Sequence, residues 1–317
     1  AIIGAGPSGL TCAYHLLLKG YKVEVFEAQR KAGGMALVGI PQYRLPKDIL
    51  LAEANTIEQL GGKFHYGRRL GKDFTLDDLF NEGFNAVFIG VGCAKGMKLG
   101  FPEDNEQIEG YYNGLDFLLQ VERGVVEGEA PSFSGDFVVV GGGNVAMDAA
   151  RCAKRLGAEN VYIVYRRGMA ELPARKEEVE HAEEEGIIFK TLCNPVEIHA
   201  NDEGFVKSIT CIEMELGEPD ASGRRRPIEK KGSEFELDVD TVIMSLGTSP
   251  NPLIRSTTPG LETNKHGCIV TEGDDGKTSR EGVYAGGDAV TGAATVIKAM
   301  GAGKAAAKAM DEYIQNK

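Results

Sequence analysis

Two glycine-rich turns, each lying between an apolar segment and a helical pattern, constrain the fold of this chain more than any other feature. The first is AIIGAGPSGL at residues 1–10, and the second is VVVGGGNVAM at residues 138–147. After each turn a helix-period pattern ends at a further glycine, Gly20 or Gly157, and another apolar run follows. This order predicts two βαβ units, and a chain of 317 residues is long enough to form two domains.

The periodicity also predicts where the main elements lie. The first unit is expected to have a strand at 1–3, a helix at 8–19 and a strand at 22–26; the second has the corresponding elements at 137–140, 145–156 and 161–165. Further strands that run into glycine are expected at 86–91, 241–246 and 282–285, with a final helix at about 295–313. The segments 206–216 and 233–239 are expected to form a hairpin around a polar connection.

Composition excludes several function classes. The net charge of −12 and the lack of a basic stripe argue against nucleic acid and anionic membranes as partners. The six cysteines are scattered singly, and neither H-E-x-x-H nor G-x-S-x-G is present, so no metal site or hydrolase nucleophile is predicted. No apolar run approaches the roughly 20 residues that span a bilayer. The first residues are strand-like, not a cleavable leader, so we expect a soluble, cytoplasmic protein.

The first turn has the form Gly4-x-Gly6-x-x-Gly9, which we call the first fingerprint. In such a turn the first glycine permits the sharp bend, the second lets backbone approach a pyrophosphate, and the third lets helix pack on strand. The unpaired amides and positive dipole of the helix N-terminus then face the phosphates. Glu27 is expected at the end of the next strand, where a carboxylate accepts hydrogen bonds from ribose hydroxyls. These residues predict a dinucleotide site.

The second fingerprint is Gly141-x-Gly143-x-x-Ala146, in which alanine is an allowed third residue. Aligning the two units places Tyr165 at the strand end, in the position of Glu27, and Arg166 and Arg167 follow it. Guanidinium groups bind a 2′-phosphate with parallel charge-assisted hydrogen bonds, so the second nucleotide is predicted to be NADPH. Arg175 either joins this pair or is an exposed residue on an acidic helix. The first site, with its ribose carboxylate, suits FAD.

Further motifs resemble a known flavoprotein family. The segments GAGPSGL, IGVG, SLGTSPN and YAGGDA, together with Glu27 and the diglycine Gly33-Gly34, resemble the pyridine nucleotide-disulfide oxidoreductase superfamily over essentially the whole chain. Within it, GGGNVAMDAAR, GIPQYRLPKDIL and GEPDASGRRRPI resemble the small (β) subunit of NADPH-dependent glutamate synthase and the large subunit of NADH-dependent ferredoxin:NADP oxidoreductase. The resemblance implies an α/β fold with two Rossmann-like domains. The FAD-binding domain would comprise residues 1–96 and 251–317, with the NADPH-binding domain, residues 97–250, inserted in it.

The resemblance also implies a set of cofactor contacts. Asp288 would bind the ribityl or phosphate region of FAD, Thr295 and Val296 would present helix N-terminal amides to the flavin pyrimidine edge, and Gly247 and Thr248 would lie by the nicotinamide arm. The FAD set is Gly4, Gly6, Pro7, Ser8, Gly9, Glu27, Ala28, Gly33, Gly34, Met35, Arg44, Val91, Gly92, Gly287, Asp288, Ala294, Thr295 and Val296. The NADPH set is Gly141, Gly142, Gly143, Asn144, Val145, Ala146, Arg166, Arg167, Arg175, Leu246, Gly247 and Thr248.

The expected reaction is hydride transfer from NADPH to FAD, which needs no catalytic side chain. Electrons would then pass to an iron–sulfur centre or partner subunit, such as a glutamate synthase large subunit. The resemblance to glutamate synthase small subunits also implies an N-terminal iron–sulfur domain, which the given sequence does not include; we expect either an excised fragment or clusters located elsewhere.

Several alternatives remain open at this point. A ferredoxin:NADP-type or dihydropyrimidine-dehydrogenase-like electron-transfer subunit would use the same chemistry, whereas a flavin-bound scaffold would not turn over. Thioredoxin- or glutathione-reductase activity is not expected, because no reactive cysteine pair follows Gly34 or lies in the NADPH half. Cys12 and Cys152 are expected to be packed small hydrophobes. The segments GRRRP and EKKG are expected to form a solvated hairpin tip and not a nucleic-acid patch.

Overall fold

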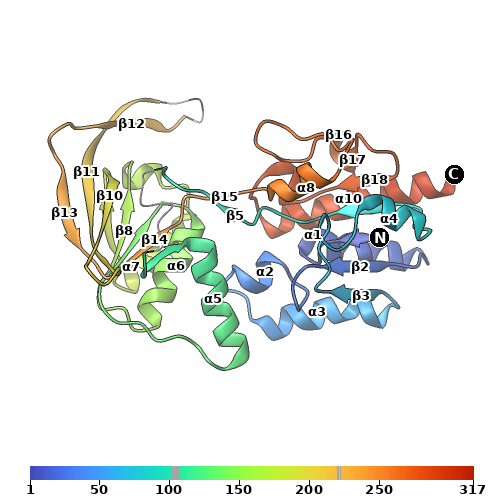
Figure 1. Ribbon diagram of the computed structural model, residues 1–317, viewed down its shortest axis with the longest axis horizontal. Coiled ribbons are helices and arrows are strands. Elements are labelled where there is room, and N and C mark those ends of the chain that lie inside the picture. The colour runs from blue at the N-terminus through green and yellow to red at the C-terminus, as the bar shows by residue number, and fades with distance from the viewer. Residues whose placement is uncertain (101–107, 220, 222) are drawn as a thin grey trace. The chain divides into compact units, whose positions relative to one another are not determined.

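The chain divides into two compact units. The computed structural model describes residues 1–100, 108–219, 221 and 223–317 (Figure 1). Unit 1 contains Ala1–Lys95 and Thr248–Lys317, and unit 2 contains Gly96–Gly247. The divisions predicted from the sequence followed residues 96 and 250. Residues 101–107, in the predicted insertion, and residues 220 and 222, in the predicted hairpin connection, lie outside the described residues.

Unit 1 is built on a seven-stranded sheet in the order β16-β17-β18-β4-β1-β2-β3. The strands from β18 to β3 pair in parallel, whereas β17 pairs antiparallel with both β16 and β18. The predicted βαβ order of β1, α1 and β2 is confirmed. The strands are β1 (Ile2–Ile3), β2 (Glu24–Glu27), β3 (Lys63–Tyr66), β4 (Val87–Ile89), β16 (Thr271–Glu272), β17 (Lys277–Thr278) and β18 (Val283–Ala285).

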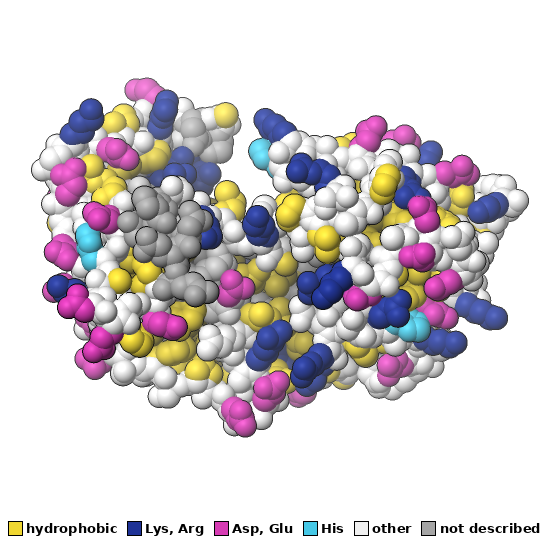
Figure 2. All heavy atoms as spheres, in the orientation of Figure 1, with side chains coloured by type: hydrophobic (Ala, Val, Ile, Leu, Met, Phe, Trp, Pro, Cys, Tyr) yellow, Lys and Arg dark blue, Asp and Glu magenta, His cyan; other side chains and the backbone are white. Residues whose placement is uncertain are grey.

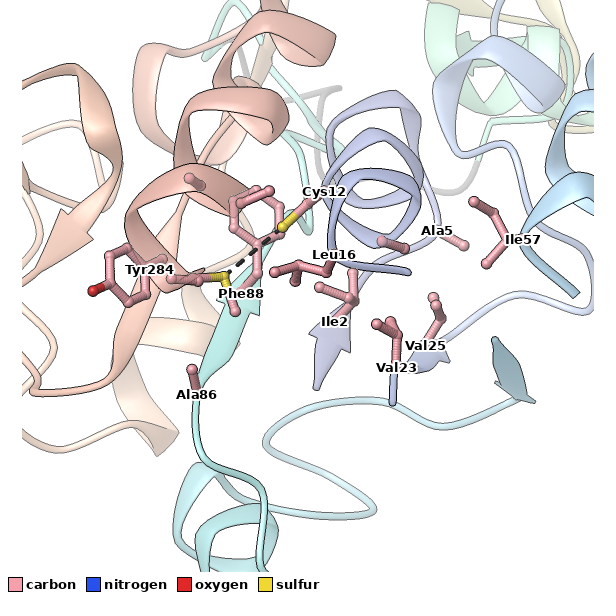
Figure 3. Close-up of a cluster of buried hydrophobic side chains, with 14 of the residues drawn as sticks. Ile2, Ala5, Cys12, Leu16, Val23, Val25, Ile57, Ala86, Phe88 and Tyr284 are labelled. Carbon is pink, nitrogen blue, oxygen red and sulfur yellow. Dashed lines mark hydrogen bonds between the residues drawn. The ribbon is translucent and has the colours of Figure 1, made fainter. Parts of the chain in front are cut away.

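Both faces of this sheet are buried, and successive side chains of each strand point to opposite faces. Ile2, Val25 and Phe88 face a cluster with residues of α1 and α10 (Figure 3), whereas their neighbours Ile3 and Phe26 face a second cluster. The helices of unit 1 are α1 (Pro7–Leu18), α2 (Met35–Val38), α3 (Lys47–Gln59), α4 (Leu76–Asn81), α8 (Pro252–Thr257), α9 (Asp288–Thr291) and α10 (Val296–Gln315), with a 3-10 turn at Gly273–Asp275.

Unit 2 is built on a five-stranded parallel sheet in the order β6-β14-β7-β8-β9. The predicted second βαβ order is confirmed by β7, α6 and β8. The strands are β6 (Tyr111–Asn113), β7 (Phe137–Val140), β8 (Val161–Tyr165), β9 (Ile188–Thr191) and β14 (Thr241–Met244). The helical segments are α5 (Gly114–Glu127), α6 (Asn144–Arg155), a 3-10 turn at Met169–Glu171, and α7 (Lys176–Glu184).

A four-stranded antiparallel sheet lies against the β7, β8 and β14 strands through a shared apolar cluster. It consists of β10 (Cys193–Ala200), β11 (Val206–Pro219), β12 (Arg225–Glu229) and β13 (Phe235–Asp238). The pairing of β11 with β13 agrees with the predicted hairpin. The polar connection was expected to be a solvated tip, and that prediction is wrong in part because β12 forms within it. The outer half of β11 needs a hydrogen-bonding partner, which β12 supplies through the pair Leu216 and Pro227.

The two segments that cross between the units, β5 (Lys95–Gly96) and β15 (Thr248–Ser249), pair with each other. Among the described residues, no helix combines the length and apolar character that a bilayer crossing requires.

Candidate cofactor sites

At the first glycines of the two fingerprints, Gly4 and Gly141, the fold of the unit itself requires glycine. Gly4 has φ of +97° and Gly141 has φ of +140°, a region that side chains with a Cβ rarely adopt. A Cβ on Gly4 would overlap the carbonyl oxygen of Gly90, and a Cβ on Gly141 would overlap that of Ser245. Gly90 and Ser245 directly follow β4 and β14, the strands that pair with β1 and β7. Both turns are therefore pressed against the end of a neighbouring parallel strand.

At the second glycines, Gly6 and Gly143, neither the backbone conformation nor a neighbouring atom of the described chain requires glycine. Their φ values are −79° and −90°, which any residue adopts. A Cβ on Gly6 would find only the Gly34 Cα, 3.9 Å away, and a Cβ on Gly143 would find no atom within 4 Å. A glycine that leaves space its own fold does not use indicates close approach of something else. Both fingerprints therefore fit a bound pyrophosphate.

Each fingerprint is followed by a helix whose first amides lack a side-chain cap. Gly6 precedes α1 and Gly143 precedes α6, and neither position carries a capping side chain. In contrast, Thr75, Asn113 and Asn251 accept hydrogen bonds from first-turn amides of α4, α5 and α8. Uncapped amides at a helix N-terminus, with the helix dipole behind them, form an anion-binding site.

Ser8, in the first turn of α1, adds a second polar group to this end of unit 1. The residue is 4% exposed, and its hydroxyl has no hydrogen-bond partner within the described part of the chain. Buried hydroxyls nearly always form a hydrogen bond, so an unpaired one at a helix N-terminus fits a ligand that accepts a hydrogen bond from it. Pro7 occupies the first helical position, where its missing amide leaves no donor unsatisfied.

Glu27 ends β2 as predicted, and its carboxylate is fixed by two backbone amides. Oε2 accepts from the amide of Ala5 at 2.7 Å, and Oε1 accepts from the amide of Gln29 at 2.7 Å. The residue is only 7% exposed. Each carboxylate oxygen has a second lone pair, so these bonds orient the group and still leave acceptor capacity for ribose hydroxyls.

The diglycine Gly33-Gly34 packs directly on the first fingerprint. The Gly33 amide donates to the carbonyl of Ala5 at 2.7 Å, and a Cβ on Gly34 would lie 2.8 Å from the Cα of Gly6. Met35 then begins α2. The segment is thus held beside the second glycine of the fingerprint, where the sequence predicted that a long ligand passes.

The predicted C-terminal part of the FAD site lies between α9 and α10. Asp288 begins α9 after Gly287, and its Oδ1 accepts from the amide of Ala294 at 3.2 Å. Burial raises the pKa of the Asp288 carboxyl above its ordinary value, and the Ala294 amide opposes that shift. Thr295 caps α10, accepting from the Lys298 amide at 3.4 Å, and Val296 is the first helical residue. A Cβ on Gly287 would lie 3.0 Å from the Cβ of Ser8, so this segment adjoins α1.

The other residues in the predicted sets are placed as follows. Ala28 follows β2, Arg44 precedes α3, and Gly92 follows β4 with φ of +67° and open space where a Cβ would stand. In unit 2, Asn144 Oδ1 accepts from the Arg175 amide at 2.9 Å, and a Cβ on Gly142 would crowd the Tyr165 ring and a methyl group of Leu172. Val91 lies in unit 1, Val145 and Ala146 lie in α6, Leu246 and Gly247 end unit 2, and Thr248 resumes unit 1.

The turn after β8 holds the predicted phosphate-binding arginines in three different settings. Arg166 is exposed. Arg167 is 7% exposed, and its Nε donates to the carbonyl oxygen of Arg225 at 2.8 Å. Arg175 precedes α7 with its guanidinium exposed, 3.7 Å from the Glu177 carboxylate. Arg166 and Arg167 therefore lie in different environments, and Arg167 has an anchor in the Arg225 carbonyl that sequence reasoning missed.

Two glycines that matter to the first site were also missed. Gly90 closes against Gly4, and a Cβ on Gly303, inside α10, would overlap the carbonyl oxygen of Ser8. Glycine inside a helix destabilises it by about 1 kcal/mol relative to alanine. The pattern GAG in the middle of an otherwise alanine-rich helix was therefore a usable signal of close helix packing.

The six cysteines are all buried thiols. Cys12 and Cys152 are packed on the buried faces of α1 and α6 as predicted, and the Cys12 sulfur lies 3.8 Å from the Met310 sulfur (Figure 3). The sequence did not predict that Cys93 and Cys268 are neighbours. The Cys93 thiol also donates to the Asp288 carbonyl at 2.9 Å. Burial, followed by the nearby Cys268, raises the pKa of Cys93 to about 12. Within the described residues no cluster of histidine, cysteine and carboxylate side chains could hold a metal ion.

Comparison with protein families identifies the family of this chain. A family model described as pyridine nucleotide-disulphide oxidoreductase matches residues 1–303. The chain belongs to this family. The resemblance inferred from the motifs is therefore confirmed at the level of the family, and the chain is a member of a group of oxidoreductases.

Two curated relatives show how varied such proteins are. The chain is 44% identical over 318 residues to the beta subunit of an NADP(+)-dependent formate dehydrogenase from Moorella thermoacetica, and the match covers 99% of this chain and 44% of that protein. It is 37% identical over 325 residues to the NADPH glutamate synthase small chain of Escherichia coli, covering 99% of this chain and 68% of that protein. The chain spans about half the length of several curated relatives that it matches.

The fold is also found among solved structures. Mycobacterium tuberculosis FprA in complex with NADPH matches with a TM-score of 0.79 at 20% identity, over 99% of this chain and 84% of that chain. At this identity the similarity concerns the fold, and it confirms the predicted α/β architecture.

Proposed function

We propose that this chain is an FAD-dependent NADPH oxidoreductase module. Unit 1 holds FAD, unit 2 holds NADPH, and the electrons pass on to an iron–sulfur centre in another domain or subunit. Membership of the pyridine nucleotide-disulphide oxidoreductase family supports the reaction type. The descriptions of the formate dehydrogenase and glutamate synthase relatives name NADP(+) and NADPH, and the FprA structure is a complex with NADPH, which supports the choice of nucleotide.

One observation carries the proposal. Gly6 and Gly143 occupy the same position in two separate βαβ units, and each leaves empty the space in which its own Cβ would stand. The two following helices begin without a side-chain cap. A single glycine turn of this kind is common, whereas two of them in one chain support two phosphate-bearing cofactors.

Each group of residues has a role in this proposal. When bound, the flavin and the nicotinamide supply hydride chemistry, for which the protein needs to provide only binding and orientation. The amides at the starts of α1 and α6 bind the pyrophosphates. Glu27 accepts from the ribose hydroxyls of FAD, Asp288 binds its ribityl or phosphate region, and the amides at the start of α10 face its pyrimidine edge. Arg166 and Arg167 bind the 2′-phosphate of NADPH.

The role of this module within the family is a separate question. We propose a glutamate synthase small-subunit-like role, with a large subunit of that enzyme as one candidate acceptor. The formate dehydrogenase relative supports a different whole enzyme built on a similar module. A ferredoxin:NADP-type or dihydropyrimidine-dehydrogenase-like subunit is the other candidate, and only the natural electron acceptor separates these roles.

The proposal is tested by anaerobic stopped-flow reduction of the purified, flavin-loaded chain. We expect the yellow absorption to bleach with NADPH, and more slowly with NADH. Candidate acceptors, including low-potential iron–sulfur proteins, are then added to the reduced protein to find which of them restores the colour. A chain that binds no FAD would overturn the proposal, and a chain that binds FAD but never bleaches would be a flavin-bound scaffold without turnover.

A further inference from the structure

The turn that carries Arg166 and Arg167 is clasped by the antiparallel sheet of unit 2. The backbone carbonyl of Arg167 accepts from the amide of Leu192 at 3.0 Å, and its Nε donates to the carbonyl of Arg225 at 2.8 Å. Arg225 is the first residue of β12, in the segment GRRRP. A stretch 58 residues further along the chain therefore contacts Arg167, one of the predicted phosphate-binding arginines, within the same unit.

The register of β11 and β12 decides which arginine of this segment faces the turn. A Cβ on Gly168 would lie 3.7 Å from the Leu216 side chain, so Leu216 faces the turn. Leu216 pairs with Pro227, and directly opposite residues in an antiparallel pair point to the same face. The register shifts between Leu216 and Pro219, where three steps along β11 match two steps along β12, so the extra residue is on β11. Side chains two residues apart on a strand share a face, so along β12 Arg225 lies on the face of Pro227 and Arg226 on the opposite one.

The charge around this turn is unusual for the chain. The protein has a net charge of −12, yet Arg166, Arg167 and the run Arg224–Arg226 place five arginines on the turn and on the start of β12. Figure 2 shows basic side chains at the upper left, with acidic side chains among them. The Arg225 guanidinium is exposed, and its Nη2 makes one long contact of 3.3 Å with the carbonyl of Leu216. No carboxylate pairs with Arg225 in the described part of the chain. An exposed guanidinium held this way has most of its five donors available to a ligand.

We propose that Arg225 is a specificity-determining residue for NADPH, which binds the 2′-phosphate from the β11–β12 hairpin together with Arg166. The inference rests on the proposed function, because it assigns a residue to the same nucleotide site. Arg167 links the two sides: its Nε is fixed by the Arg225 carbonyl, so the turn and the hairpin hold each other in place. The hairpin is then part of the nucleotide site and not a solvated tip. A guanidinium is suited to this role because its planar fork binds a phosphate through two parallel hydrogen bonds.

The experiment measures binding to the full chain by isothermal titration calorimetry. The probe is 2′,5′-ADP, which carries the 2′-phosphate, and 5′-AMP, which lacks it, is the reference. We expect Arg225→Gln to weaken 2′,5′-ADP binding roughly tenfold or more and to leave 5′-AMP binding unchanged, since each charge-assisted hydrogen bond to a phosphate is strong. Arg226→Gln is the matched control, one residue away on the other face of β12, and should change neither affinity by more than about twofold.

Both Arg225→Gln and Arg225→Lys keep the backbone carbonyl that anchors Arg167, and Arg225→Lys also keeps the charge, so it separates the loss of charge from a merely structural effect. We expect it to recover part of the lost 2′,5′-ADP affinity. In steady-state kinetics, Arg225→Gln should raise KM for NADPH and leave KM for NADH unchanged.

The outcomes separate the two proposals. Equal affinity of the wild-type chain for 2′,5′-ADP and 5′-AMP would overturn the NADPH assignment and, with it, the role of Arg225. A wild-type preference for 2′,5′-ADP that persists in Arg225→Gln would overturn the role of Arg225 alone. Equal losses in Arg225→Gln and Arg226→Gln, or a loss for 5′-AMP as large as that for 2′,5′-ADP, would do the same.

Discussion

The carboxylate oxygen Oε2 of Glu27 accepts a hydrogen bond from the backbone amide of Ala5 at 2.7 Å. This bond joins the end of β2 to the turn of the first fingerprint, across the two strands that begin unit 1. The second oxygen is fixed by Gln29. The carboxylate is therefore held in position by the protein before any ligand arrives, which lowers the entropy that binding must overcome.

Replacing Glu27 by glutamine should weaken FAD binding. The amide side chain offers one acceptor oxygen in place of two, so the Ala5 or Gln29 amide loses its partner, and a hydrogen bond to a charged group is worth about 1.5–3 kcal/mol. We expect the variant to lose flavin on gel filtration, measured as flavin absorbance per chain. Glu24→Gln, on the same strand and bonded to His65, is the control and should keep its flavin. Equal flavin content in both variants would contradict this role.

Gly143→Ala should block NADPH binding and leave the fold intact. The added methyl group meets no protein atom within 4 Å, and φ of −90° suits alanine, so the melting temperature should not change. The methyl group would occupy the space where the pyrophosphate approaches, so KM for NADPH should rise at least about tenfold. Gly141→Ala, by contrast, should unfold at a lower temperature because φ is +140°. An unchanged KM in Gly143→Ala would show that this turn is only structural.

Gly303→Ala should destabilise unit 1. The new methyl group would overlap the Ser8 carbonyl oxygen, so α10 would have to move away from α1. The same substitution at Gly301, two residues earlier in α10, meets no atom within 4 Å and should stabilise the helix by about 1 kcal/mol. Urea unfolding of the two variants measures the difference. A stabilising Gly303→Ala would disprove the close packing of these helices.

Asp311→Asn should lower stability at neutral pH and matter less in acid. Lys19 donates to Asp311 at 2.6 Å and Tyr21 at 2.7 Å, and the Lys19 hydrogen bond holds the pKa of Asp311 below its ordinary value. A depressed folded pKa stabilises the protein above the unfolded pKa of about 3.9, and this contribution is lost as pH falls through the folded value. The same bond raises the pKa of Lys19, so the Lys19 contribution is lost only as pH rises through its raised folded value, above about 10.4.

The measurement compares melting temperatures of the wild type and Asp311→Asn at pH 7 and at about pH 3. The gap between them should narrow in acid. Glu312→Gln, next along α10 in an exposed pair with Lys308, is the control and should have almost no effect at either pH. A gap that is the same at both pH values would show that the charge of Asp311 is not the cause.

The native thiols should be unreactive. Burial raises the pKa of Cys152 and Cys211 to about 12 and that of Cys193 to about 11, so almost no thiolate exists near neutral pH. Ellman's reagent should therefore detect all six thiols only after denaturation. Rapid reaction of two thiols in the folded chain would instead favour a redox-active pair, for which Cys93 and Cys268 are the neighbouring candidates.

Local patterns predicted the inner parallel strands of both sheets, but not the parallel strands β3, β6 and β9. Strands such as Val138–Val140 read as continuous apolar runs because both faces of a parallel sheet are buried, and glycines mark the turns that follow. The end of β8 at Tyr165 was predicted at the correct residue, and β2 ends at Glu27, one residue beyond the predicted strand 22–26. The site residues at the fingerprints are local to these turns, so their positions followed from the same reasoning.

Contacts between distant segments were not predictable from the same patterns. Strand β12, with the sequence RRPIE, has largely exposed residues, and only the unpaired edge of β11 makes it a strand. The contact of Arg167 with Arg225, and those of Gly4 with Gly90 and of Gly303 with Ser8, depend on how separate elements pack. A single sequence without its fold shows a glycine or an arginine at these positions, but not which neighbour requires it.

The interleaved order of the two units has a consequence for synthesis on the ribosome. Strand β4 pairs with β18, and α1 packs against α10, so the amino-terminal half of unit 1 lacks its partners until residues 283–315 have been translated. Unit 2 is contiguous and has all its strands as soon as Gly247 emerges. The middle of the polypeptide can therefore reach its native state first, while the nascent beginning waits, with apolar surface uncovered, for the last segment to be made.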